Sequence, residues 1–322
     1  MRRMSALESL MPQRETFGRD TVAGLTGGVA SVPDGMAAAT LAGVNPALGL
    51  YASIVGPVIG GLLSSTVLMR VVTTSAAALA AGSILGATPD VDRPAALALL
   101  VLIAGVVALV LGLLRLARYT RFVSYSVMTG FLSGVAVLLI LSQLDAVTGV
   151  TTTADSMVES VLDVILGFAD WDIATVLVAA LTVALLVVVA RTRFASWAAL
   201  VALAVPTAAV ELLDADTVAV VGAFPGGLPL PALPSLDLLS LDVITGGVAV
   251  AVIVVIQGAG GATSAPNPDR SRSRLSRDFI AQGAANIGVG LVQGAPVGGS
   301  VSQTALNIQA GARTRWAAIT SG

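Results

Sequence analysis

Apolar runs of about 20 residues recur along this chain, and they constrain its fold more than any other feature. A helix of that length crosses the hydrocarbon core of a bilayer. Such runs predict eight spans, at 21–40, 46–64, 94–114, 122–144, 173–190, 196–213, 241–262 and 278–292. Charged residues make up only 11% of the 322 residues, against roughly 25% in soluble domains. The chain is therefore predicted to be an all-α polytopic membrane protein.

Two further apolar stretches are too short to cross a bilayer. They occupy 73–86 and 299–311, and each carries small and hydroxylated residues at its N-terminal end. Short extended-looking runs lead into them at 67–72 and 291–298. A pair of interrupted spans in corresponding halves of a chain is typical of a secondary-transporter binding site. Two half-helices that begin inside the membrane would aim unpaired N–H groups and positive dipole ends at an anion.

The composition argues against several kinds of chemistry. The chain has no Cys and no His, which removes disulfides, thiol nucleophiles and imidazole ligands. A zinc or redox enzyme is therefore not expected, and we predict neither an enzyme nor a cofactor. The formal net charge is −2, so no global basic face is available for nucleic acid.

The distribution of charge predicts how the spans are oriented. Every basic side chain is Arg, and all but Arg70 and Arg93 lie in segments that share one side if the spans alternate. Acidic residues concentrate in the loops on the other side. By the positive-inside rule, the Arg-rich side is cytoplasmic. We therefore expect a multi-pass protein of the plasma (inner) membrane with a cytoplasmic N-terminus, and an amphipathic helix at 150–171 on the outer surface.

Short motifs around the first two spans and the last three apolar segments resemble one known family. They read AGLT (23–26), VPDGMA (32–37), LAGVNP (41–46), GLY (49–51), SRDF (276–279), QGAAN (282–286), PVGGS (296–300), TALN (304–307) and GART (311–314). On these residues the chain resembles the SulP sulfate-permease family of anion transporters, to which prestin also belongs.

The resemblance implies a fold of seven-plus-seven inverted repeats, with two half-helices and short cross-over strands, in which a core domain moves against a gate domain. The second repeat has only three members in this chain, so the chain looks C-terminally truncated, and transport is expected of the whole protein. The expected parts are a cytoplasmic N-terminus (1–20), core spans 1–4 (21–118), gate spans 5–7 (119–216), an outer Pro-rich loop (217–240) and core spans 8–10 (241–322).

The resemblance also implies where an anion binds. By position in the family motif, Thr74 and Ser75 lie on one side of it, and Val301 and Ser302 lie on the other. Binding would be chiefly through backbone N–H groups at the starts of the two half-helices. The alternative for these positions is ordinary packing of small residues between helices.

Asp34 lies inside the first span, where the family often has Gln after the Pro. A carboxylate in a membrane core is costly, which makes it a functional-site hypothesis. Beside a bound anion, desolvation and like charge both favour its protonated form. A protonated Asp34 would donate a hydrogen bond to the substrate and carry a proton with it. The alternative is an Asp satisfied by nearby Ser, Thr or backbone groups.

Three further polar residues are candidates for auxiliary roles. Arg70 would supply a fixed positive charge or pair with Asp34, unless it snorkels to the cytoplasmic face. Some relatives carry Arg where this chain has Gln303, a departure that Arg70 would offset. Gln257 stands where the family commonly has an acidic residue that takes part in sodium coupling. Because a neutral amide is a poor primary Na⁺ ligand, we expect a proton as the coupling ion.

These features together predict secondary active transport of a small anion (sulfate, bicarbonate, chloride or dicarboxylate) by proton-coupled symport. A nucleobase permease of the same fold is the nearest rival, and it would prefer a carboxylate at Gln257. An anion channel or a non-transporting membrane scaffold is the rival from another class. The expected partners are a small inorganic or carboxylate anion and the lipid bilayer, with a homodimer as a candidate assembly and no nucleic acid.

Overall fold

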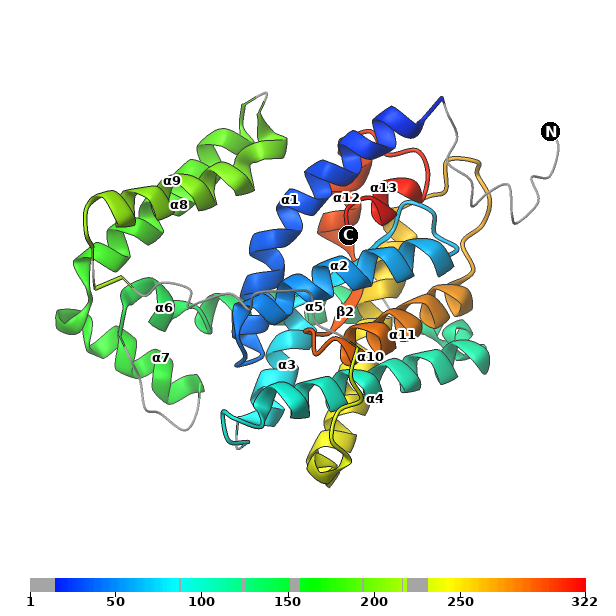
Figure 1. The fold of residues 1–322 in the computed structure, drawn as a ribbon, viewed down its shortest axis with the longest axis horizontal. Helices are drawn as coiled ribbons and strands as arrows, with labels where there is room; N and C mark the ends of the chain where they lie inside the picture. Colours follow the sequence, from blue (N-terminus) through cyan, green and yellow to red (C-terminus); the bar gives the residue numbers. More distant parts are fainter. Residues whose placement is uncertain are drawn as a thin grey trace. The chain divides into compact units, whose positions relative to one another are not determined.

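The computed structural model describes residues 15–86, 88–122, 125–150, 157–192, 194–215, 217–218 and 231–322. These residues form helices and two short strands (Figure 1). In chain order the α-helices and strands are α1 (Phe17–Leu41), α2 (Pro46–Leu63), β1 (Arg70–Thr73), α3 (Ser75–Leu85), α4 (Arg93–Leu113), α5 (Tyr125–Leu141), α6 (Leu144–Thr148), α7 (Met157–Leu166), α8 (Ile173–Ala190), α9 (Ala198–Leu212), α10 (Leu241–Ser264), α11 (Leu275–Leu291), β2 (Val297–Ser300), α12 (Val301–Gln309) and α13 (Trp316–Ile319). Short 3₁₀ helices occupy Leu116–Phe122, Phe168–Asp170, Ala195–Trp197 and Leu236–Leu238.

The described chain divides into two compact units. The larger unit holds α1 to α4 and α10 to α13, and the smaller unit holds α5 to α9. In the smaller unit, α8 packs against α9 and α6. That the larger unit is the core domain and the smaller unit the gate domain remains a proposal.

All eight predicted spans coincide with helices, although several ends differ. The largest difference lies in the predicted span 122–144, where α5 stops at Leu141 and α6 forms separately after a turn. Among the described residues, α2, α4, α8 and α10 are long and apolar enough to cross a membrane. Of the other four helices at predicted spans, α5, α9 and α11 are shorter than 18 residues, and α1 is long enough but less apolar, with several Gly, Ser and Thr residues besides Asp34.

Several predicted segments lie partly outside the described residues, including the span 122–144 at residues 123 and 124. The expected amphipathic helix at 150–171 contains α7, with residues 151–156 outside the description. Residues 1–14 of the expected N-terminal segment and 219–230 of the expected Pro-rich loop also lie outside it.

The two predicted cross-over strands pair with each other. β1 and β2 form an antiparallel ribbon in which Arg70 pairs with Ser300 and Thr73 pairs with Val297. The two short apolar stretches follow directly as α3, of 11 residues, and α12, of 9 residues. The prediction of half-helices entered through extended runs is therefore confirmed, with slightly shorter helices than the stretches 73–86 and 299–311.

Glycine allows the helices of the larger unit to approach closely. The backbones of α4 and α11 lie side by side along most of their length (Figure 1). A Cβ added at Gly105 of α4 would stand 2.6 Å from the backbone N of Ile287, and one at Gly283 would meet the backbone of Leu109. Without a hydrophobic driving force between helices in lipid, such close contact is a main source of stability.

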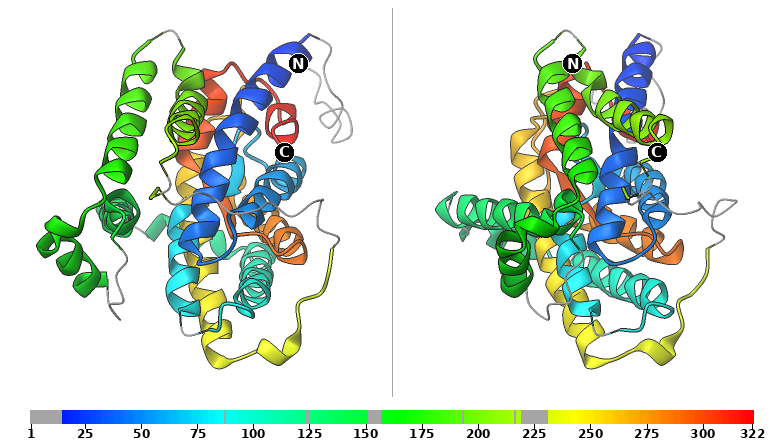
Figure 2. Two further views of the ribbon diagram at one scale, coloured as in Figure 1. Left: turned by 60° about the vertical axis from the view of Figure 1, so that its left-hand side comes forward. Right: turned by 90° about the vertical axis from the view of Figure 1, so that its left-hand side faces the viewer.

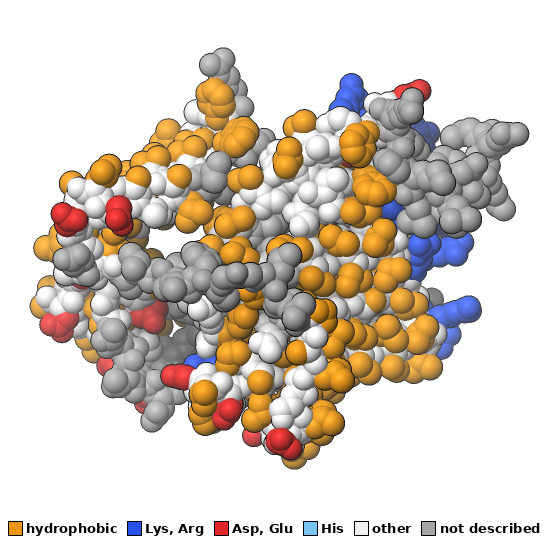
Figure 3. All heavy atoms as spheres, in the orientation of Figure 1, with side chains coloured by type: hydrophobic (Ala, Val, Ile, Leu, Met, Phe, Trp, Pro, Cys, Tyr) orange, Lys and Arg blue, Asp and Glu red, His pale blue; other side chains and the backbone are white. Residues whose placement is uncertain are grey.

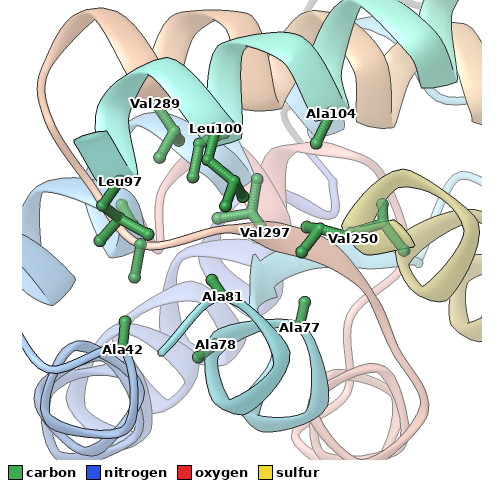
Figure 4. Packing of buried hydrophobic residues seen from close by; sticks show 14 of the residues in the cluster. Ala42, Ala77, Ala78, Ala81, Leu97, Leu100, Ala104, Val250, Val289 and Val297 are labelled. Atoms are coloured by element: carbon green, nitrogen blue, oxygen red, sulfur yellow. The ribbon is translucent and has the colours of Figure 1, made fainter. Parts of the chain in front are cut away.

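The ribbon lies in the core of the larger unit. Both strands are almost wholly buried, and they contact α2, α10 and α11. Figure 4 shows Val297 of β2 between Leu100 of α4 and Ala81 of α3, with Val250 of α10 beside it. Small side chains on α3 leave room for the strand, which explains the run of alanines at the start of that helix.

Large apolar side chains also cover the outside of the molecule. Leu25, Leu113 and Val106 are all more than one third exposed. On the face in Figure 3, hydrophobic side chains cover the larger unit between an end with most of the visible Arg side chains and an end with most of the acidic ones. An apolar surface bounded by charge is what a protein surrounded by lipid requires.

Candidate functional site

The ribbon places the starts of α3 and α12 opposite each other. α3 follows the end of the ribbon where Thr73 pairs with Val297, and α12 follows the end where Ser300 pairs with Arg70. The two helices leave the ribbon in opposite directions (Figure 2). Three strand steps separate the two ends, or roughly 10 Å. Both positive helix ends therefore point inward across the ribbon.

The start of α3 has free hydrogen-bonding capacity. The backbone N–H of Thr74 continues the ribbon by donating to Pro296 O at 3.3 Å, but its side chain does not cap the helix. The N–H groups of the first helical turn, beginning with Ser75, have no intrahelical acceptor. The hydroxyl groups of Thr73 and Thr74 are buried and have no hydrogen-bond partner among the described residues.

The start of α12 is partly capped. The hydroxyl of Ser300 accepts from Gln303 N at 3.3 Å and lies 3.2 Å from the hydroxyl of Ser302. Val301 and Ser302 are exposed within the described chain, so their N–H groups are at an accessible helix end. The structure thus brings the four predicted binding residues to two facing helix starts, and their role in binding stays a prediction.

Arg70 is fully buried, and its side chain does not reach the surface. Its Nη1 donates to Gln303 Oε1 at 2.8 Å, and its Nη2 donates to the hydroxyls of Ser31 at 3.0 Å and Ser321 at 2.8 Å. Its Nε has no hydrogen-bond partner in the part of the chain that the structure describes. A Cβ at Gly27 would stand 2.7 Å from the guanidinium carbon, so only glycine leaves room for the group there.

Asp34 and Arg70 are linked through an amide rather than paired directly. The Nε2 of Gln303 donates to Asp34 Oδ2 at 3.2 Å, while its Oε1 accepts from Arg70. Within the described chain, Asp34 accepts no other side-chain hydrogen bond and is half-buried in α1. Among the described residues its other oxygen has no hydrogen-bond partner, and both the coupling role and the structural alternative for Asp34 stay predictions.

Gln257 lies on α10, which packs along β2. Its neighbour Gly258 approaches Gly299 so closely that an added Cβ at Gly299 would stand 2.9 Å from the Gly258 Cα. Gln257 itself is half-buried, and its Oε1 has no hydrogen-bond partner. The described residues contain no group of three or more acidic side chains that could hold a metal ion.

A row of polar side chains on α11 is a feature that the sequence analysis did not assign. Asp278, Gln282 and Asn286 are four residues apart, so they share one face of the helix, and all three are fully buried. The amide of Asn286 both donates to and accepts from the backbone of Val297, and Gln282 Oε1 accepts from Gly299 N at 3.0 Å. These side chains hold β2 in position. In the sequence, this row could have been found from the recurrence of a polar residue every four positions in an otherwise apolar helix.

Two buried carboxylates hold the loops at the ends of this unit. Asp278 accepts hydrogen bonds from Ser64, Ser65 and Thr66, which connect α2 to β1. Asp20 of α1 accepts from the backbone of Arg313 and Thr314 after α12. The first loop leads into β1 and the second follows α12, so the two carboxylates fix segments next to the candidate site without belonging to it.

Paired half-helices on a buried antiparallel ribbon, inside a bundle with an apolar exterior, define the architecture of a membrane transporter. Residues 17–322 match the model of the sulfate permease family, and the chain belongs to that family. It is 33% identical over 311 residues to a probable sulfate transporter of Mycobacterium tuberculosis, covering 94% of this chain and 55% of the relative. It is 27% identical to the chloroplastic sulfate transporter 4.1 of Arabidopsis thaliana, covering 96% of this chain and 47% of that relative.

Solved structures share the fold. The transmembrane domain of the cyanobacterium bicarbonate transporter BicA superposes with a TM-score of 0.83 at 23% identity, covering 96% of this chain and 81% of that one. The murine solute carrier 26 family member A9 anion transporter in its inward-facing state gives a TM-score of 0.83 at 19% identity, covering 98% of this chain and 57% of that one. The expected family and transporter fold are thus confirmed, and the family is one of permeases rather than enzymes. The chain spans about half the length of the curated relatives that it matches.

Proposed function

We propose that the whole protein is a secondary active transporter that carries a small anion across the plasma membrane. The anion binds between the N-termini of α3 and α12, against Thr74 and Ser75 on one side and Val301 and Ser302 on the other. The observation that carries the proposal is that two helix starts with free backbone N–H groups point inward beside a buried Arg70 that has no ion-pair partner among the described residues.

The buried polar atoms around the ribbon support an anion over a neutral substrate. Arg70 is permanently charged and has no carboxylate in direct contact. The unpartnered hydroxyls of Thr73 and Thr74 add donors near the start of α3. Leaving such groups buried and unpaired is costly, and a bound anion offsets that cost.

A proton is the coupling ion in this proposal. Asp34 supplies a carboxyl group beside the site, with one oxygen free to exchange a proton. Gln257, at the position where the family resemblance implies an acid, offers only a neutral amide. Alternating access moves the larger unit, as the core, past the smaller unit, as the gate. In this proposal the N-terminus is cytoplasmic and the protein is embedded in the lipid bilayer. A homodimer is a candidate assembly.

Uptake into proteoliposomes tests the proposal. The whole protein is reconstituted, and labelled sulfate and bicarbonate are each tested with an inward proton gradient and with an inward Na⁺ gradient. We expect accumulation driven by the proton gradient and saturable with substrate. Uptake that is linear with concentration and indifferent to either gradient would indicate a channel instead.

Asp34→Asn separates the coupling role from a structural one. The variant should keep anion exchange, because the amide can still donate a hydrogen bond, and it should lose proton-driven accumulation. Asp242→Asn, which removes an exposed carboxylate at the start of α10, is the matched control and should behave as the wild type. Undiminished proton-driven uptake by Asp34→Asn would make Asp34 a structural residue.

A further inference from the structure

The candidate site combines fixed and titratable charge. Arg70 contributes one fixed positive charge. Each half-helix N-terminus acts as roughly half a positive charge. The site therefore presents about two positive charges when Asp34 is protonated, and about one when Asp34 is ionised.

No other ionised side chain enters this balance from the elements that pack on α1. Those elements are α2, α3, α12, α13 and β1. Arg70 of β1 is their only charged residue, and Tyr51 of α2 is their only other residue with a titratable side chain. On α1 itself, Arg19 and Asp20 lie at the far N-terminal turns, where Asp20 is engaged by the loop after α12.

Gln303 determines which oxygen of Asp34 can hold a proton. Because its Oε1 accepts from Arg70 at 2.8 Å, its NH₂ group must face the carboxyl of Asp34, to which it donates at 3.2 Å. Oδ2 of Asp34 therefore remains an acceptor in either protonation state. The proton resides on Oδ1, which has no hydrogen-bond partner among the described residues and is free to donate to a bound anion.

We infer that the protonation state of Asp34 sets the valence of the bound anion: protonated Asp34 matches a divalent oxyanion, and ionised Asp34 matches a monovalent one. The inference rests on the proposed function, because it takes the anion to lie between the half-helices. An anion beside a carboxyl group favours the protonated form in proportion to the anion's own charge, and low-dielectric surroundings strengthen the effect. A dianion therefore takes up a proton on binding in a pH range where a monoanion does not.

Sulfate and perchlorate provide a matched pair of probes, because both are tetrahedral oxyanions and they differ in charge. Binding of each to the purified whole protein is measured by calorimetry between pH 5 and pH 8. Proton uptake is obtained from the dependence of the heat on the buffer. Comparing pH dependence rather than absolute affinity removes the difference in hydration between the two ions.

For the wild type and the Asp242→Asn control, we expect close to one proton taken up per sulfate and clearly less per perchlorate. Sulfate affinity should fall by about tenfold per pH unit over the range where free Asp34 is ionised. In Asp34→Asn both pH dependences should vanish, with sulfate binding retained. Equal proton uptake for the two anions, or none for sulfate, would overturn the valence inference while leaving anion binding intact. Absence of binding by either anion would instead overturn the proposed function.

Discussion

Two groups of buried polar side chains flank the same ribbon and differ in how completely they are satisfied. On α11, the side-chain oxygens and amides of Asp278, Gln282 and Asn286 all have partners, in strands and loops or, for the amide nitrogen of Gln282, in the backbone of α11 itself. At the starts of the half-helices, Arg70 Nε and the hydroxyls of Thr73 and Thr74 have none.

The difference separates scaffold from site. Buried polar groups that stabilise a fold are hydrogen-bonded, because an unpaired one costs about 1–3 kcal/mol. Unpaired buried groups are available to a ligand where they lie beside a helix start. Within the described residues of the same unit, Arg93 Nε, Gln257 Oε1, Asn307 Oδ1 and Trp316 Nε1 are also unpartnered. The row on α11 therefore holds the ribbon, and unsatisfied donors lie on or next to the ribbon near the start of α3.

The largest effect is expected from Asp278→Ala. The change leaves the hydroxyl and backbone donors of Ser64, Ser65 and Thr66 without their acceptor, which should cost about 3 kcal/mol or more. Thermal unfolding in detergent should show a markedly lower melting temperature than for Asp242→Ala, whose carboxylate is exposed. Equal melting temperatures for Asp278→Ala and Asp242→Ala would show that the satisfied row on α11 does not stabilise the fold.

Arg70→Met should weaken anion binding more than it lowers stability. Methionine removes the buried cation but leaves Gln303 Oε1 and the hydroxyls of Ser31 and Ser321 without their donor. The melting temperature should therefore fall less than in Asp278→Ala, because an uncharged side chain of similar length costs less to bury. Anion affinity should fall by about 100-fold, because a charge-assisted contact inside the protein is worth roughly 3 kcal/mol. Binding that survives this change would place the anion away from Arg70.

How far the sequence predicts the structure depends on the range of the interactions involved. The lengths of apolar runs placed α8 at its observed bounds and located both half-helices, because these patterns are local. The contacts of Arg70 with Ser31, Gln303 and Ser321 join residues far apart in the chain, which no local pattern encodes. The sequence analysis therefore left Arg70 between two alternatives.

Gly27→Ala tests the placement of the guanidinium by a smaller change. The added methyl group would contact Arg70 and displace it, which should lower anion affinity by about tenfold, or 1.4 kcal/mol, with little loss of stability. Gly18→Ala on the same helix is the control, because a Cβ there meets nothing within 4 Å. Isothermal titration with sulfate compares the two variants, and equal affinities would contradict the assignment.

Thr74→Val should have the smallest effect. Valine keeps the shape of the side chain and removes the unpartnered hydroxyl, so we expect a loss of roughly fivefold in affinity, or about 1 kcal/mol, and no loss of stability. Ser83→Ala, which removes an exposed hydroxyl bonded within α3, serves as the control in the same titration. A lower melting temperature of Thr74→Val would indicate that Thr74 stabilises the fold rather than binds the anion.

The central claim is that an anion lies between the two half-helix starts. Anomalous diffraction from crystals of the whole protein soaked in selenate measures this directly, because selenium marks the position of a sulfate-like anion. We predict a peak within hydrogen-bonding reach of the first backbone N–H groups of both α3 and α12, beginning at Ser75 and Val301. A peak elsewhere, in crystals whose protein transports selenate, would contradict the account.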